Sequence, residues 1–246
     1  MRLDNVHARY ARRADWVLRG VNAEVKAGEV VVLTGRNGAG KSTLLRVIAG
    51  MIPVGRGELR DRPRVVSWLP DRFPTAQPFT VRSYLRAMGR VRGLDQSTTD
   101  AAAGALADRL HLTPFMSTRL AELSQGTGRK VGLVLALLTA PGLLVMDEPW
   151  EGLDAQSQAE LPVLVDEVTA QGGICVLTDH RGRSGDLGTV RHWSMRDGVV
   201  QEEDAPAPAP RTRHVIEVVV DAHDPATEVA RLRAAGYDVR RVRGEA

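Results

Sequence analysis

The chain has 246 residues, of which 43% are apolar and 26% are charged, a balance typical of one sizeable globular domain with an appendage. Its net charge of +3 is carried by arginines spread along the chain without a basic tract, so nucleic acid is not an expected partner. No run of about eighteen apolar residues occurs, and the first residues lack a basic and apolar leader, so neither a membrane span nor a secretory signal is expected. The single cysteine, Cys175, excludes a disulfide within the chain and is predicted to be buried in a strand.

The first third of the chain predicts a strand-rich start followed by a strand, a loop and a helix. Residues 2–10 and 21–25 predict two short strands around a turn at 12–15. The apolar run at 29–34 predicts a buried strand, and residues 44–50 predict a helix closed by glycine.

Between this strand and helix, residues 35–43 read Gly-Arg-Asn-Gly-Ala-Gly-Lys-Ser-Thr and match the phosphate-loop pattern G-x-x-x-x-G-K-[ST]. The glycines let backbone N–H groups point at phosphate oxygens, and the helix N-terminus adds roughly half a positive charge. Lys41 is expected to bind the β- and γ-phosphates, and the Ser42 hydroxyl to ligate Mg²⁺. The predicted nucleotide contacts here are Gly35, Asn37, Gly38, Ala39, Gly40, Lys41, Ser42 and Thr43.

Further along, residues 65–69 predict a strand that ends at Pro70 and Asp71. Alanine, arginine and leucine at helical spacing then predict a mostly helical insertion over about 79–140. The run at 143–146 predicts a buried strand that delivers Asp147 and Glu148 at its carboxyl end, which is the ligand edge of an open parallel sheet.

The remaining segments predict a helix over 156–170, a strand over 174–178 followed by His180, and a hairpin over 191–203 that turns at Asp197 and Gly198. Alternating alanine and proline at 205–210 predict a stiff linker, and residues 211–246 predict a small β-α-β extension. The nucleotide-binding domain is therefore expected to span 1–204.

Three later motifs narrow the class of phosphate-loop protein. Residues 123–127, Leu-Ser-Gln-Gly-Thr, resemble the L-S-G-G-Q signature of the ATP-binding cassette (ABC) ATPases. Asp147-Glu148-Pro149 and the later Gly-Leu-Asp ending at Asp154 resemble that family's Walker B strand and D-loop, and His180 stands where its switch histidine belongs. The order and spacing match over residues 1–203.

The resemblance implies a fold and a set of roles. The fold would be an α/β P-loop cassette with a RecA-like core, an antiparallel β subdomain and an inserted helical subdomain. Asp147 would hold Mg²⁺ with Ser42, Glu148 would polarise the attacking water, and His180 would contact the γ-phosphate.

Other positions have two interpretations. Tyr10 resembles the family's adenine-stacking aromatic, with Trp16 as the rival position. Ser124 and Gly126 match signature positions that reach the γ-phosphate of a partner cassette, and Asp154 matches the D-loop; a serine before a helix is also an ordinary N-cap.

Three positions depart from the family pattern. Gln125 replaces the first signature glycine, Thr127 replaces the signature glutamine, and Asp71 stands in place of the Q-loop glutamine. Because carboxylate oxygen is a good Mg²⁺ ligand, Asp71 is expected to act through the metal.

Taken together, the resemblance implies an ATP- and Mg²⁺-dependent ATPase subunit of an ABC transporter, of export type. It would form a homodimer or heterodimer of cassettes around two ATP, and would drive a separate transmembrane permease from the cytoplasmic face of the cell membrane. The alternatives are a soluble ABC ATPase of another machinery, such as iron–sulfur cluster assembly, and a cassette that binds ATP without turnover.

Overall fold

The computed structural model describes residues 1–180, 182–203 and Val229. The predicted linker at 205–210 and the extension at 211–246, apart from Val229, lie outside the described residues. In chain order the elements are β1 (Arg2–Ala8), β2 (Leu18–Glu24), β3 (Val30–Gly35), α1 (Lys41–Ile48), β4 (Arg56–Arg60), β5 (Val66–Leu69), α2 (Val81–Val91), α3 (Gln96–Arg109), η1 (Thr113–Phe115), η2 (Leu120–Glu122), α4 (Gln125–Leu137), β6 (Leu143–Met146), α5 (Ala155–Ala170), β7 (Ile174–Thr178), η3 (Arg183–Asp186), β8 (Val190–Arg196) and β9 (Val199–Glu203).

A six-stranded sheet in the order β5-β6-β7-β3-β8-β9 forms the centre. Its strands pair in parallel, except for the antiparallel hairpin of β8 and β9. Strands β3, β6 and β7 are continuous apolar runs because both faces of the sheet are covered. Along each of them, successive side chains enter two separate hydrophobic clusters, as the alternation of a strand requires.

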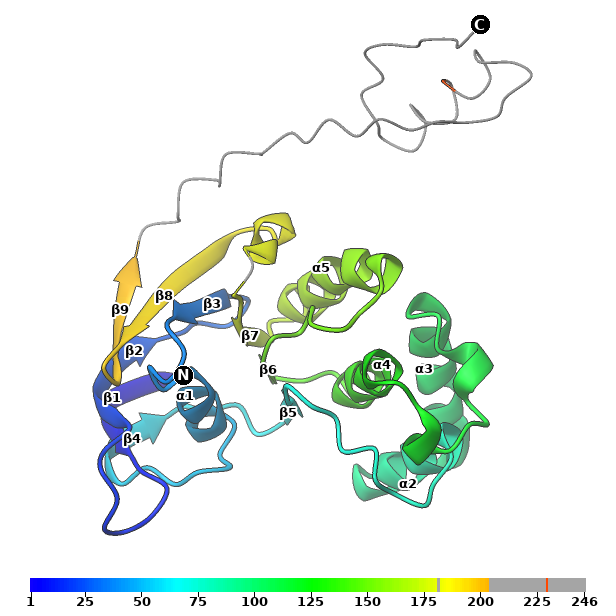
Figure 1. Cartoon of the computed structure of the whole chain (residues 1–246), viewed down its shortest axis with the longest axis horizontal. Coiled ribbons are helices and arrows are strands. Elements are labelled where there is room, and N and C mark those ends of the chain that lie inside the picture. Colours follow the sequence, from blue (N-terminus) through cyan, green and yellow to red (C-terminus); the bar gives the residue numbers. More distant parts are fainter. Residues whose placement is uncertain (181, 204–228, 230–246) are drawn as a thin grey trace, which may run out of the picture. The chain divides into compact units, whose positions relative to one another are not determined.

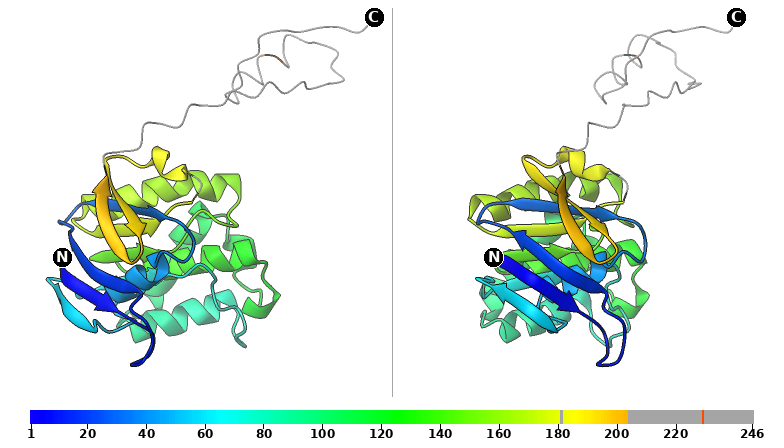
Figure 2. Two further views of the ribbon diagram at one scale, coloured as in Figure 1. Left: turned by 60° about the vertical axis from the view of Figure 1, so that its left-hand side comes forward. Right: turned by 90° about the vertical axis from the view of Figure 1, so that its left-hand side faces the viewer.

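The two clusters define two layers (Figures 1 and 2). One face of the central sheet packs against α1 and the antiparallel sheet β2-β1-β4, coloured blue and cyan. The other face packs against α4 and α5, with α2 and α3 beyond α4. The predicted fold class is confirmed, since the structure combines a parallel core, an antiparallel sheet and helices inserted between β5 and β6.

The turns follow from their residues. Helix α1 ends where Gly50, at φ 80°, lets the N–H groups of Gly50 and Met51 reach back to the carbonyl groups of Val47 and Arg46. Asp197 and Gly198 both have positive φ, as the tight turn between β8 and β9 requires. The sequence did not predict β4, because this edge strand is mostly exposed and its Arg-Gly-Glu-Leu-Arg sequence lacks an apolar face.

The register of the parallel strands determines where the site can form. Leu69 of β5 pairs with Met146 of β6, which pairs with Leu177 of β7, and Thr178 pairs with Leu33 of β3. Four strands therefore end at one edge of the sheet. Among the described residues, no helix has the length and apolar character needed to cross a membrane.

Candidate functional site

The phosphate loop leaves β3 where the backbone passes very close to β8. A Cβ atom on Gly35 would lie 2.5 Å from the carbonyl oxygen of Met195, so a side chain at this position would push the strands apart. Gly40 takes φ 108° as the N-cap of α1 and has no capping side chain, so the first N–H groups of α1 remain available to an anion. The loop is thus shaped as a phosphate cradle.

Lys41 stands at the first turn of α1 and turns back into this cradle. Its ammonium donates to the carbonyl oxygen of Gly35 at 2.8 Å and to that of Arg36 at 3.1 Å. The residue is only 7% exposed, and burial lowers its pKa, while Glu148 and then Asp147 oppose that change. A buried ammonium close to two carboxylates is placed to bind phosphate oxygens.

Tyr10 lies beside the same helix. Its hydroxyl group shares a hydrogen bond of 2.9 Å with the Thr43 hydroxyl and accepts one from Arg46 at 3.1 Å, while the residue is 59% exposed. The rival ring, Trp16, is covered by the guanidinium of Arg9, 4.3 Å from the ring centre, and is also near that of Arg56. Tyr10 is therefore the more accessible of the two rings.

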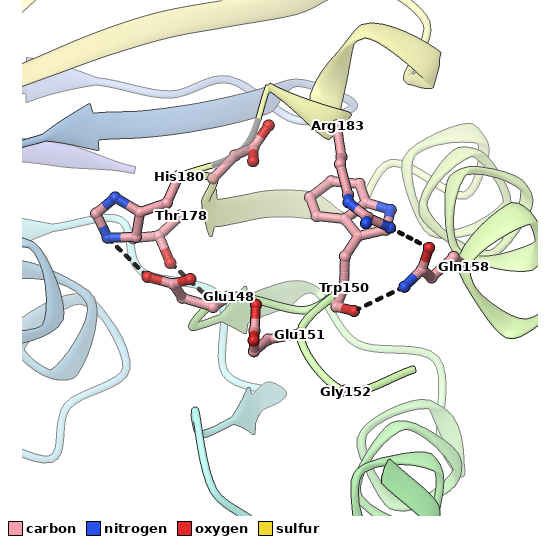
Figure 3. Close-up of a pocket in the computed structure, with 9 residues that line it drawn as sticks. Glu148, Trp150, Glu151, Gly152, Gln158, Thr178, His180 and Arg183 are labelled. Carbon is pink, nitrogen blue, oxygen red and sulfur yellow. Dashed lines mark hydrogen bonds and ion pairs between the residues drawn. The ribbon is translucent and has the colours of Figure 1, made fainter. Parts of the chain in front are cut away.

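Strand β6 delivers its two acids at the sheet edge, as the sequence predicts. The buried Thr178 hydroxyl donates to Asp147 Oδ1 at 2.9 Å and accepts from the Glu148 N–H at 2.8 Å. His180 Nε2 lies 2.7 Å from Glu148 Oε1. Figure 3 shows the imidazole and this carboxylate pointing toward one another, with Thr178 beside them.

Glu148 has an unusual backbone and an unusual charge environment. Its φ of 52° lies in the left-handed region, which costs a non-glycine residue about 1–3 kcal/mol. Burial is the main reason that its pKa is raised; His180 opposes the rise, while Asp147 and Asp71 add to it. A raised pKa makes the carboxylate a better proton acceptor.

The signature segment forms the start of α4. Ser124 is its N-cap, and the Ser124 hydroxyl accepts from the Thr127 N–H at 3.1 Å and shares a 2.8 Å hydrogen bond with the Thr127 hydroxyl. A Cβ atom on Gly126 would lie 2.2 Å from the carbonyl oxygen of Gly152, so this glycine lets the signature helix touch the loop that follows Glu148. The ordinary N-cap interpretation of Ser124 is confirmed, and a capped helix N-terminus also suits an anion.

Two buried cations follow on α4. Lys130 forms an ion pair with Asp154, the N-cap of α5, and this pair together with the Ser157 N–H lowers the pKa of Asp154 to about 2 against the opposing effect of burial. Arg129 donates to the carbonyl oxygens of Asp71, Asp147 and Glu148.

Asp71 lies on the more exposed side of the cluster formed by Arg129, Asp147 and Glu148. Its side chain is 54% exposed, and its Oδ1 lies 3.7 Å from Arg129 Nη1. The structure thus places Asp71 next to a cation of the signature helix and within electrostatic range of Glu148.

The residues present fit a Mg²⁺ ion held together with a nucleotide. Asp147 and Glu148 both act on the single ammonium of Lys41, so bound phosphates would leave a local excess of negative charge. Within the described part of the chain, no group of three His, Cys, Asp or Glu side chains is arranged to hold a metal alone. A small number of protein oxygen ligands, completed by phosphate oxygens, suits Mg²⁺, which proteins commonly bind through one or two side chains and substrate phosphates.

Sequence reasoning missed Thr178, Arg129 and the side chains that line a small pocket next to Glu148 (Figure 3). Trp150, Gln158 and Arg183 form the far side of this pocket, where Gln158 accepts from Arg183 and donates to the Trp150 carbonyl. Thr178 could have been noticed as a polar residue that closes an apolar strand just before His180. The sequence gives no comparable signal for Arg129. Only the packing of the folded chain buries this arginine and leaves other arginines exposed.

Strand, glycine loop and helix, with two carboxylates and a histidine at the same sheet edge, define a P-loop ATPase. A family model described as "ABC transporter" matches residues 18–151. The chain therefore belongs to the ABC transporter family and is an ATPase of that family.

Curated relatives support this assignment. The zinc import ATP-binding protein ZnuC of Cereibacter sphaeroides is 33% identical over 70% of this chain and 69% of its own length. The sn-glycerol-3-phosphate import ATP-binding protein UgpC of Burkholderia cenocepacia is 33% identical over 63% of this chain but only 46% of its own length. Both are named as import proteins, so the expectation of an export-type subunit is not supported.

Solved structures agree on the fold. An ATP-binding subunit of an ABC transporter superposes with a TM-score of 0.73 at 27% identity, covering 82% of this chain and 88% of that one. The dimeric ATP-binding cassette MJ0796, bound to ADP and Pi, superposes with a TM-score of 0.67 at 22% identity, covering 84% of this chain and 99% of that one.

The raised pKa of Glu148 predicts that Glu148→Gln stabilises the fold at alkaline pH. Because the folded-state pKa lies above its ordinary value of 4.5, folding favours the protonated form, and this stabilisation is lost as pH rises through the folded-state pKa. Glutamine stays neutral at every pH, so the variant should not lose this folding stability as pH rises. We expect thermal unfolding at pH 8 to give a higher Tm for Glu148→Gln than for wild type, and the difference to shrink toward pH 4.5.

Asp95 provides a control of opposite sign. This N-cap of α3 has its pKa lowered to about 2, chiefly by the Thr98 N–H, so its ionised form is the stabilising one. Asp95→Asn should therefore lower the Tm at pH 8. A Glu148→Gln protein that is less stable than wild type at pH 8 would contradict the charge environment described above.

Proposed function

We propose that the protein is the ATP-hydrolysing subunit of an ABC transporter, that it pairs with a second cassette around two ATP, and that it drives a separate membrane permease. The observation that carries the proposal is the meeting of Lys41, Asp147, Glu148 and His180 at one edge of the parallel sheet. Both relatives reported above are named as ATP-binding proteins of transporters, which favours transport over a soluble role such as iron–sulfur cluster assembly.

The chemistry assigned to these side chains is hydrolysis of the γ-phosphate bond. Lys41 and the N–H groups at the start of α1 bind the phosphates, and Glu148 accepts a proton from the attacking water. His180, 2.7 Å from that carboxylate, orients the water and contacts the γ-phosphate. Ser42 and Asp147 would hold Mg²⁺, which neutralises phosphate charge when bound, and Asp71 would be a further oxygen ligand, directly or through water.

The signature helix contributes to a second active site. Ser124 and the other exposed groups at the start of α4 are assigned to the γ-phosphate bound by a partner cassette, with Asp154 at the junction. The same arrangement would serve a homodimer or a heterodimer. Tyr10 is assigned to adenine, since its ring is exposed beside α1.

The proposal places the protein in the cytoplasm, on the inner face of the cell membrane, through its permease. The ionised residues needed for turnover are present, which favours an active ATPase over a cassette that only binds ATP.

Glu148→Gln should bind ATP normally and stop turnover, because the amide cannot accept the proton of the attacking water. Gel filtration with ATP should then show a trapped dimer, while the same protein without nucleotide should not dimerise more than wild type. Hydrolysis at the wild-type rate would refute the assignment of Glu148.

Lys41→Ala and Ser124→Arg should each be inactive alone, since one removes the phosphate-binding ammonium and the other blocks the site of the partner. A mixture should regain part of the hydrolysis, because a heterodimer restores one site with intact Lys41 and intact facing Ser124. Mixtures that contain heterodimer, as shown by differential tags, and yet recover no activity would argue against shared sites.

Asp71→Gln should keep turnover within about tenfold of wild type, since an amide oxygen can still face Mg²⁺. Asp71→Lys should abolish turnover by placing a cation where the metal is expected. Steady-state ATPase rates against Mg²⁺ concentration test this. If all three proteins show one rate and one Mg²⁺ dependence, Asp71 lies outside the active site.

A further inference from the structure

We propose that Arg129 is a positioning residue for ATP hydrolysis: it connects the loop at Asp71 to the main chain of the catalytic residue Glu148. This inference rests on the proposed role of Glu148 in hydrolysis. No motif assigns a role to Arg129, which the sequence shows only as one of many arginines. Its contacts single it out.

Arg129 is one of the largest fully buried side chains described, with 1% of its surface exposed. Its Nη2 donates to the carbonyl oxygen of Asp147 at 2.6 Å and to that of Glu148, and its Nη1 donates to that of Asp71. One planar group thus joins the chain after β5 to the chain after β6, from a position on the signature helix.

The contacts of Arg129 are better explained by a positioning role than by a gain in folding stability. A buried guanidinium is disfavoured, and burial lowers the pKa of Arg129 although Asp71 opposes that effect. In addition, its Nε is buried and has no hydrogen-bond partner among the described residues. An apolar side chain would avoid these penalties but would leave the three carbonyl oxygens without this donor, so the value of the guanidinium lies in the groups that it holds.

Arg129 fixes the main chain at Glu148, which has an unfavourable left-handed conformation. Glu148 stands at φ 52°, with its N–H bonded to Thr178 and its carbonyl oxygen bonded to Arg129. These two contacts keep a left-handed backbone in place, and that backbone aims the carboxylate at His180. A shift of the Asp71 carbonyl would move Arg129 and, through it, Glu148.

The test compares Arg129→Lys with wild type in the full chain, by steady-state ATP hydrolysis and by ATP binding. Lysine keeps the charge but cannot span three carbonyl groups, so kcat should fall at least about tenfold while KM changes less than about threefold. Arg129→Met, which fills similar space without charge, is the second variant and should lose at least as much.

Arg92→Lys is the matched control. Arg92 is a partly buried arginine, and it also donates to a carbonyl oxygen of α4, that of Leu135, away from the site. Arg92→Lys should leave kcat within about twofold of wild type, because a substitution remote from the site does not move Glu148. A similar loss in Arg92→Lys would mean that any disturbance of α4 lowers activity, and would overturn the proposal.

A measurement in the Glu148→Gln background separates positioning from a general structural role. If Arg129 acts through Glu148, the slow residual hydrolysis of Glu148→Gln, followed over a long single-turnover time course, should fall less than about threefold further when Arg129→Lys is added. An equal loss in both backgrounds, or unchanged kcat in Arg129→Lys, would refute the role of Arg129 alone. Equal turnover of wild type and Glu148→Gln would instead refute the proposed role of Glu148 and the inference with it.

Discussion

The parallel pairing of β5, β6, β7 and β3 is the constraint on which the rest of the site depends. Parallel strands in register all end at the same edge, and here the paired residues Leu69, Met146 and Leu177 mark that edge on three neighbouring strands. Asp71 follows β5, Asp147 and Glu148 follow β6, His180 follows β7, and the phosphate loop follows β3. The edge is also where open parallel sheets bind their ligands.

Two charged groups at this edge, Lys41 and Glu148, are held outside their ordinary environment. Lys41 is buried against main-chain carbonyls and its pKa is lowered, whereas the pKa of Glu148 is raised. Each shift favours the neutral form, so the fold tolerates charges here that phosphates and a metal ion would compensate. Such opposed shifts in one place are typical of a site built for function.

The signature helix α4 combines an exposed N-terminus with buried side chains that contact the site. Its N-terminus is capped by Ser124 and exposed, while its next turn carries Arg129 and Lys130 into the interior. Through these two cations the helix holds the backbone around Glu148 and the N-cap of α5 at Asp154. Gly126 permits this, because its missing side chain lets the helix lie against the Gly152 carbonyl.

The relation of sequence to structure differs between local and long-range features. Strands β3, β6 and β7, helix α1 and the hairpin at Asp197 and Gly198 could be predicted because hydrophobic period and turn residues are local signals. The strand β4 could not, since its polar sequence depends on its neighbour β1 for pairing. The family motifs likewise identify an ATPase from the sequence alone, whereas the expected export direction finds no support in the relatives, which are named as import proteins.

The sequence by itself thus determined the phosphate loop, the acidic strand end and the membership of an ATPase family, since these are carried by residues adjacent in the chain. Only the tertiary structure decided which polar groups meet. The Thr178 hydroxyl between Asp147 and Glu148, and Arg129 among three carbonyl groups, come from segments far apart in the chain. The physical reason is that burial gives an arginine or a threonine its role, and burial is set by the packing of distant elements rather than by the residues on either side.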